Sequence, residues 1–143
     1  LSIGHSARDT FKMLHEVGVE INQKPFAVGF RIEHPQILIN QYQYGEEHDN
    51  PRLGPAEYRL TNQANGKGVY TFCMCPGGIV IPSQSEIDTV VVNGMSEYKR
   101  DKINSNSAIL VTVDETDFGN GVFAGVDFQR EIEKKAFVLG LKL

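Results

Sequence analysis

Strand-like segments fill the middle of this 143-residue chain, and long helical patterns lie only near its two ends. Strands are expected over residues 25–33, 57–62, 68–75, 79–82, 89–92 and 108–113. Helices are expected over residues 7–17 and 123–139, with a short one beginning at Pro35. Because strands and helices are segregated along the chain, this order predicts an α+β fold with a mostly antiparallel β-sheet, an N-terminal helix and a C-terminal helix.

Short signals mark where several of these elements begin and end. Ser6 is expected to cap the first helix, with Asp9 three residues later, and Gly18 is expected to end it. Asn65-Gly66 predicts a tight hairpin turn between two neighbouring strands, because both residue types tolerate positive φ angles. The chain opens without Met on Leu1-Ser2-Ile3, which we expect to be the end of a strand in a piece of a longer protein.

Size and charge restrict the classes of protein to which the chain can belong. A length of 143 residues, 41% hydrophobic and 22% charged, fits a single domain with its own core. The net charge of −4 and the lack of a basic stripe argue against a nucleic-acid partner. No apolar stretch reaches the roughly 20 residues that cross a bilayer, so no membrane partner is expected. Two cysteines separated by one residue form a poor disulfide, which favours a reducing, cytoplasmic setting.

The run Cys73-Met74-Cys75-Pro76-Gly77-Gly78 is the first candidate site, because it ends strand-like sequence with two thiols and flexible backbone. An exposed Cys-x-Cys pair is reactive or metal-binding, whereas a buried pair packs as two small hydrophobic side chains. A closed zinc site needs about four Cys or His ligands, and the histidines are scattered, so no metal is expected. Strand alternation favours burial of both cysteines on one face, followed by a plain hairpin turn.

Asn93-Gly94-Met95-Ser96 is the second segment of the candidate site. Its first two residues are also typical of a simple type I′ turn, which would need no function. Arg31 and Glu33 alternate along an expected strand and would share one sheet face. A surface ion pair between them is the favoured interpretation.

Gly4-His5-Ser6 marks a turn into the first helix. A nucleophile elbow is rejected, because Gly-x-Ser-x-Gly would need a glycine where Arg8 stands. The free N–H groups of a helix N-terminus, with Arg8 nearby, could instead hold an anion, although a plain helix cap is favoured. The chain has neither a Gly-x-Gly-x-x-Gly fingerprint nor a Gly-Lys-Ser or Gly-Lys-Thr phosphate loop, so no recognised dinucleotide motif is present.

Several short segments spread over nearly the whole chain, in one order, carry a family resemblance. They cover residues 4–10, 24–29, 31–35, 68–78, 93–96, 106–108, 124–126 and 128–130. In these segments the chain resembles the uncharacterised bacterial FAD-dependent dehydrogenases, also called NAD(FAD)-utilizing dehydrogenases. The resemblance implies that residues 1–143 form the substrate, or cap, domain inserted in a longer flavoprotein oxidoreductase.

This resemblance also implies cofactors, partners and site residues. FAD is expected in the full-length parent and not in this fragment, which is expected to be inactive alone. The expected partners are the FAD-binding domain of the same parent chain and a small-molecule substrate. Residues expected near the flavin are Gly4, His5 and Ser6; those expected in loops facing the flavin or substrate are Cys73, Cys75, Pro76, Gly77, Gly78, Asn93, Gly94, Met95 and Ser96. The family's substrate is not established, so no catalytic role is assigned.

Two other classes of function stay open. The chain could be a non-catalytic binding or assembly module whose exposed sheet face docks a partner. It could also be a small redox protein that uses its two thiols, which unreactive cysteines in the folded state would exclude. Within the flavoprotein hypothesis, Cys73 or Cys75 could serve the flavin as redox partner or proton donor, although a structural role is favoured.

Overall fold

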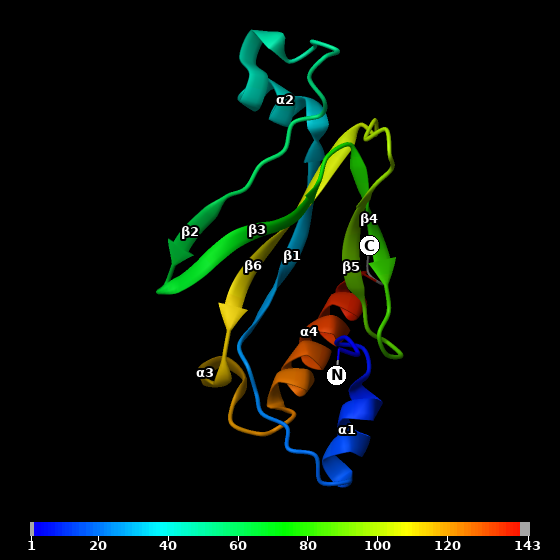
Figure 1. The fold of residues 1–143 in the computed structure, drawn as a ribbon, viewed down its shortest axis with the longest axis vertical. Helices are drawn as coiled ribbons and strands as arrows, with labels where there is room; N and C mark the ends of the chain where they lie inside the picture. Colours follow the sequence, from blue (N-terminus) through cyan, green and yellow to red (C-terminus); the bar gives the residue numbers. More distant parts are fainter. Residues whose placement is uncertain (1, 141–143) are drawn as a thin grey trace. The chain divides into compact units, whose positions relative to one another are not determined.

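The computed structural model describes residues 2–140, and Figure 1 shows their helices and strands. The strands are β1 (Phe26–Pro35), β2 (Thr61–Ala64), β3 (Lys67–Cys75), β4 (Gly78–Ser83), β5 (Val91–Ser96) and β6 (Asn104–Val113). The helices are α1 (Arg8–Glu16), α2 (Gln36–Tyr44), α3 (Glu115–Phe118) and α4 (Ala124–Gly140), with a 3₁₀ turn η1 (Gly45–Glu47). The predicted α+β class, with mostly antiparallel sheet and helices towards both ends, is confirmed.

The described chain divides into two compact units, and each is described by itself. The first consists of the described parts of Leu1–Phe26, Ser83–Val91 and Val113–Leu143, and it contains α1, α3 and α4. The second consists of Ala27–Pro82 and Val92–Thr112, and it contains α2 and nearly all strand residues. We call them the helical unit and the sheet unit.

In the sheet unit, four strands are hydrogen-bonded in the order β1-β6-β3-β2, and β4 pairs with β5 in a second sheet. Strands β2 and β3 form an antiparallel hairpin in which Ala64 lies opposite Lys67. The two turn residues, Asn65 and Gly66, have φ angles of 52° and 78°. Positive φ at both positions defines the type I′ turn that suits the twist of a hairpin, so the predicted turn is confirmed.

Strand β3 bulges where it pairs with β6. Phe72 lies opposite Ala108 and Cys75 lies opposite Asn106, so β3 uses one residue more than β6 across this interval. Cys73 sits in the bulge with a φ of 46°. A bulge turns side chains away from strict alternation, and here it separates the environments of the two cysteines.

The buried part of β6 is polar. Ser105, Asn106 and Ser107 are fully buried, and Ala108 follows them as a buried apolar residue. Buried polar groups require hydrogen-bond partners, so this part of the sheet unit is organised by specific bonds as much as by apolar packing.

In the helical unit, aromatic packing and side-chain caps define the elements. Phe26 stacks on Phe118 with ring centroids 5.2 Å apart, and Phe128 packs against both rings. Asp114 and Asp117 form a reciprocal capping box around α3, where a turn was expected. Gly18 follows the C-cap of α1 with a φ of 87°, as predicted for a glycine that ends a helix.

Five local predictions are wrong. Ala7, not Ser6, is the N-cap of α1, and no side chain caps it. The strand expected from residue 57 begins only at Thr61, and Ser2 and Ile3 are not in a strand, while Leu1 lies outside the described residues. The turn after Cys75 is not a hairpin, because β3 and β4 belong to different sheets. Asn93-Gly94 lies inside β5 and forms no turn.

Candidate functional site

The structure brings the two predicted site segments, residues 73–78 and 93–96, into contact within the sheet unit. Ser96 Oγ donates a hydrogen bond of 2.7 Å to the carbonyl oxygen of Pro76. Gly78 packs directly against the Met95 carbonyl, and Gly94 packs against Cys75. Residues separated by about twenty positions in sequence therefore form one surface, which we call the loop cluster.

The glycines of the loop cluster permit close packing of the chain against itself. A Cβ atom on Gly77 would overlap the carbonyl group of Arg100, and its φ of 48° is also unfavourable for other residues. A Cβ atom on Gly78 would overlap the Met95 carbonyl oxygen and lie 2.7 Å from Ser96 Oγ. Both glycines are buried, so the space beside them is filled by the protein's own backbone.

The buried side chain of Gln36 fixes the position of this turn. Its Oε1 accepts a 2.8 Å hydrogen bond from the backbone N–H of Gly77. Its Nε2 donates to the carbonyl oxygen of Ala56 at 3.0 Å and to Asn40 Oδ1 at 2.8 Å. One amide at the start of α2 thus holds the 73–78 segment to two other parts of the sheet unit, and nothing in the sequence pattern singled it out.

Arg31 links the cysteines to the buried polar part of β6. Its Nη1 donates to Asn106 Oδ1 at 2.7 Å and to the carbonyl oxygen of Cys73 at 3.0 Å, and it lies 4.0 Å from Cys75 Sγ. Gly94 closes this group, because a Cβ there would overlap both Asn106 Oδ1 and Arg31 Nη1. Asn106 Nδ2 is buried without a hydrogen-bond partner among the described residues.

Two predictions about these side chains are wrong. Arg31 does not form the expected surface ion pair; it is committed to β3 and β6, while Glu33 accepts a 2.6 Å hydrogen bond from Asn104 Nδ2. The cysteines are not buried together: Cys73 is exposed and Cys75 is half-buried. The bulge is the physical reason, since it breaks the alternation on which the burial argument depended.

A cleft of about 550 Å³ adjoins the exposed cysteine in the sheet unit. Residues 57–59 line one side, and residues 71–74 of β3 line the other. Tyr58 Oη lies 2.7 Å from His34 Nε2, and His34 Nδ1 lies 3.1 Å from Ser105 Oγ. Burial raises the pKa of Tyr58, against smaller lowering effects of the Ser107 hydroxyl and the Arg31 charge, so the phenol is neutral at pH 7. Of these residues, the candidate-site run identified from the sequence contains only Cys73 and Met74.

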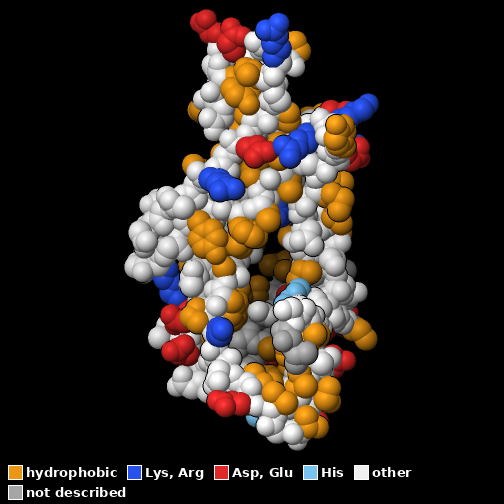
Figure 2. All heavy atoms as spheres, in the orientation of Figure 1, with side chains coloured by type: hydrophobic (Ala, Val, Ile, Leu, Met, Phe, Trp, Pro, Cys, Tyr) orange, Lys and Arg blue, Asp and Glu red, His pale blue; other side chains and the backbone are white. Residues whose placement is uncertain are grey.

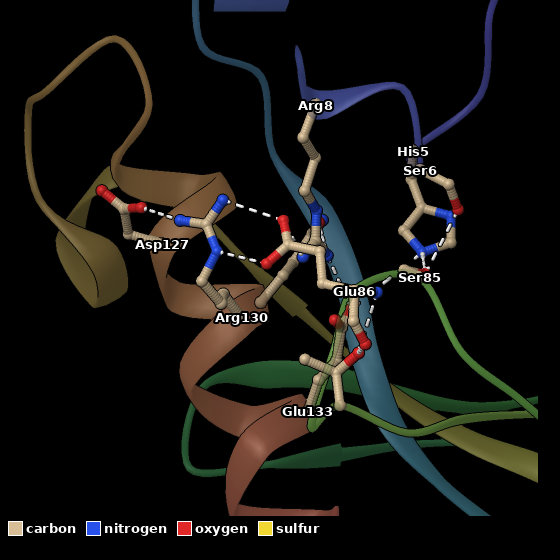
Figure 3. A network of polar contacts seen from close by, with 10 residues as sticks. His5, Ser6, Arg8, Ser85, Glu86, Asp127, Arg130 and Glu133 are labelled. Atoms are coloured by element: carbon tan, nitrogen blue, oxygen red, sulfur yellow. Dashed lines mark hydrogen bonds and ion pairs between the residues drawn. The ribbon is translucent and has the colours of Figure 1, made fainter.

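The other predicted site segment, Gly4-His5-Ser6, lies in the helical unit beside a network of charges (Figure 3). Ser85 Oγ lies 3.2 Å from both Ser6 Oγ and His5 Nε2. Arg8 is buried, and its guanidinium contacts Glu133 Oε1 at 2.7 Å and Glu86 Oε1 at 3.2 Å. The network therefore joins the segment before α1 to the 83–91 segment and to α4.

Glu86 is the most perturbed carboxylate of this network. Arg130 contacts it with two nitrogens, Nε at 2.7 Å and Nη2 at 2.9 Å (Figure 3). These hydrogen bonds, with those of Arg8 and the positive charge of both arginines, hold the pKa of Glu86 at about 2. Sequence patterns gave no signal for this network, because its members are far apart along the chain.

The positive charge beside Gly4-His5-Ser6 is already paired with carboxylates, while Arg8 Nε and Nη1 have no hydrogen-bond partner among the described residues. A pyrophosphate group needs unpaired N–H donors and positive charge. Arg8 is instead enclosed by two carboxylates, and Asp9 Oδ1 already accepts from the backbone N–H of Thr10. That Gly4, His5 and Ser6 lie near a flavin stays a prediction.

Two further searches concern the described part of the chain alone. Within residues 2–140, no three His, Cys, Asp or Glu side chains come together in a way that could hold a metal ion. None of the helices among these residues has the length and apolarity to cross a membrane.

Comparison with known proteins places the chain in a family. Residues 25–143 match the family model described as FAD-dependent protein, C-terminal domain-like. A protein of Clostridium beijerinckii, named "Uncharacterized protein", is 52% identical over 143 residues. This alignment covers 98% of the chain but only 27% of the relative, so the chain spans about a quarter of that protein's length. The chain therefore belongs to the family of FAD-dependent protein, C-terminal domain-like sequences.

Proposed function

We propose that this chain is the substrate, or cap, domain of a longer FAD-dependent oxidoreductase of the dehydrogenase type. FAD would be held mainly by another domain of the same parent chain, which would be the principal partner of this one. The chain would bind and orient a small-molecule substrate and exclude water from it, while the flavin supplies the redox chemistry. Alone, it would be inactive.

The observation that carries the proposal is the assembly of the loop cluster in a member of an FAD-dependent family. Residues 73–78 and 93–96 are packed together, held by Gln36 and Arg31, and Cys73 is left exposed at their edge beside a cleft. A rigid surface of this kind is suited to position a substrate. Because the space beside Gly77 and Gly78 is filled by backbone, we assign the flavin- or substrate-facing role chiefly to Cys73 and its neighbours in the cleft.

Exposed apolar side chains support contact with a further part of a larger protein. The four-stranded sheet carries Phe30 at 78% exposure and Ile32 at 39%, both on β1 and away from the cleft lining. Figure 2 shows separate groups of apolar side chains open to solvent on the visible face. A covering domain would bury such side chains.

Both cysteines are free, in agreement with the proposed reducing, cytoplasmic setting.

The test compares the full-length parent with the 143-residue chain. The purified parent should show the absorption spectrum of bound flavin, and the chain titrated with FAD in a calorimeter should show no tight binding. A parent free of flavin, or a chain that binds FAD tightly by itself, would refute the proposal.

The exposed sheet residues also keep a second candidate open, a non-catalytic binding or assembly module. In that case the full-length parent would contain no flavin, and substitution of Phe30 by Ser would abolish partner binding.

A further inference from the structure

We propose that the cleft between residues 57–59 and residues 71–74 binds a small molecule that carries a carboxylate on a flat apolar body. The proposal deepens the proposed function, on which it rests, because it names the chemical class of the domain's substrate. Of the residues that line the cleft, the candidate-site run identified from the sequence contains only Cys73 and Met74.

The cleft forms where two neighbouring segments diverge. Leu60 and Thr71 are held together, since Thr71 N–H donates to the Leu60 carbonyl at 2.9 Å and Leu60 N–H donates to Thr71 Oγ1 at 2.8 Å. Past this point β3 bulges at Cys73, and the registered pairs of β2 with β3 end at Thr61 and Tyr70. The resulting volume of about 550 Å³ lies in the range of roughly 300–1,000 Å³ that is usual for small-molecule sites.

The apolar surface of the cleft is fixed before any ligand arrives. Phe72 is 55% exposed, and Met74 and the ring of Tyr58 are half-buried. The Tyr58 hydroxyl is bound to His34, which is bound in turn to the fully buried Ser105. An aromatic ring held in this way loses little conformational entropy when a flat ligand packs on it.

The charges that line the cleft favour an anionic ligand. The carboxylate of Glu57 is already paired with Arg100 Nη1 at 2.7 Å. Arg59 is exposed and makes no hydrogen bond or ion pair with any described residue. A guanidinium presents N–H groups in the geometry that matches a carboxylate, so Arg59 is the group that would hold the ligand's charge. Tyr58 does not oppose an anion, because its phenol stays neutral at pH 7.

Cys73 is exposed in the described chain, and its thiol serves as the site-specific reporter of occupancy when the full-length protein is assayed. It lines the cleft, and Cys75, on the same strand, gives an internal reference. Alkylation by iodoacetamide is followed for each cysteine by peptide mass spectrometry, with benzoate as the probe. We expect benzoate to slow alkylation of Cys73 in a saturable manner, and benzyl alcohol, which has the ring without the charge, to protect much more weakly.

Substitutions then test the assigned contact. Arg59→Ala should weaken protection by benzoate about tenfold, the effect of losing one charge-assisted hydrogen bond. Arg52→Ala, at another exposed arginine of the sheet unit that does not line the cleft, should leave protection unchanged. Circular dichroism of each variant verifies that it is folded.

Three results would overturn the inference: no protection by benzoate, equal protection by benzyl alcohol, or undiminished protection in folded Arg59→Ala. Protection by phenyl phosphate but not by benzoate would also refute the inference, because the cleft would then bind a phosphate and not a carboxylate. The measurement does not involve flavin. A parent without flavin would therefore refute the proposed function alone, whereas a flavin-loaded parent without protection would refute only the cleft.

Discussion

The buried charge of Glu133 should contribute strongly to the stability of the helical unit. Glu133 is 7% exposed and its Oε1 lies 2.7 Å from Nη2 of Arg8, which is 4% exposed. With an effective dielectric constant of about 20 and charge centres about 4 Å apart, the attraction is about 4 kcal/mol. Part of this is offset by the desolvation of Glu133, whose Oε2 has no hydrogen-bond partner among the described residues.

We therefore expect Glu133→Gln to lower the free energy of unfolding by about 2–3 kcal/mol. Glutamine keeps the shape and one acceptor, and Glu86 still neutralises part of the charge of Arg8. The matched control is Glu131→Gln on the same helix. It removes an exposed pair with Lys135, which should leave stability nearly unchanged.

Urea denaturation of the 143-residue chain, followed by far-ultraviolet circular dichroism, measures both changes. The double variant Arg8→Met/Glu133→Leu adds a second test. It should be more stable than Arg8→Met alone, because that single change leaves a buried carboxylate without its closest counter-charge. Equal effects of Glu133→Gln and Glu131→Gln, or a double variant less stable than Arg8→Met, would refute the argument.

Three further predictions follow from other sites. The pKa of Glu86 in the folded chain is about 2, below its ordinary value of 4.5. The contribution of its ionised form to the free energy of unfolding is therefore complete above about pH 4.5 and is lost as the pH falls towards 2. Glu86→Gln should flatten the dependence of stability on pH in that window. Gly94→Ala should destabilise the chain by about 1–3 kcal/mol in urea denaturation, since its Cβ would overlap Asn106; an unchanged midpoint would contradict the close packing. Cys73→Gly should leave the stability unchanged or raise it by up to about 1 kcal/mol, because glycine adopts the positive φ of this position without strain. Cys75→Gly should lower the stability. The reverse order of urea midpoints would be inconsistent with the bulge.

Features that depend only on residues adjacent in the sequence were predictable from it. Asn65-Gly66 specifies its turn through its own backbone preferences, and Gly18 ends α1 for the same reason. The segregation of strands and helices likewise sufficed for the fold class. Ser6 shows where such reasoning fails: its hydroxyl bonds to Ser85 instead of capping the helix, and no local pattern contains that partner.

The candidate site was only partly predictable. Residue composition identified the 73–78 and 93–96 segments, but not the bulge that exposes Cys73 and leaves Cys75 half-buried. The roles of Gln36 and Arg31 were missed, as were the cleft residues other than Cys73 and Met74, because ordinary side chains acquire a role only through the groups placed beside them.

The sequence by itself determined the class of fold, the hairpin and the segments that break regular structure, since these depend on backbone preferences a few residues long. The tertiary structure alone decided what those segments contact. Gly77 and Gly94 are glycines because other groups occupy the space of a side chain: the Arg100 carbonyl beside Gly77, and the half-buried Arg31 with the buried Asn106 beside Gly94. Arg8 and Arg130 are bound to carboxylates from distant segments. Such contacts depend on which residues folding brings together, and a local sequence pattern does not show which residues from distant segments will lie side by side.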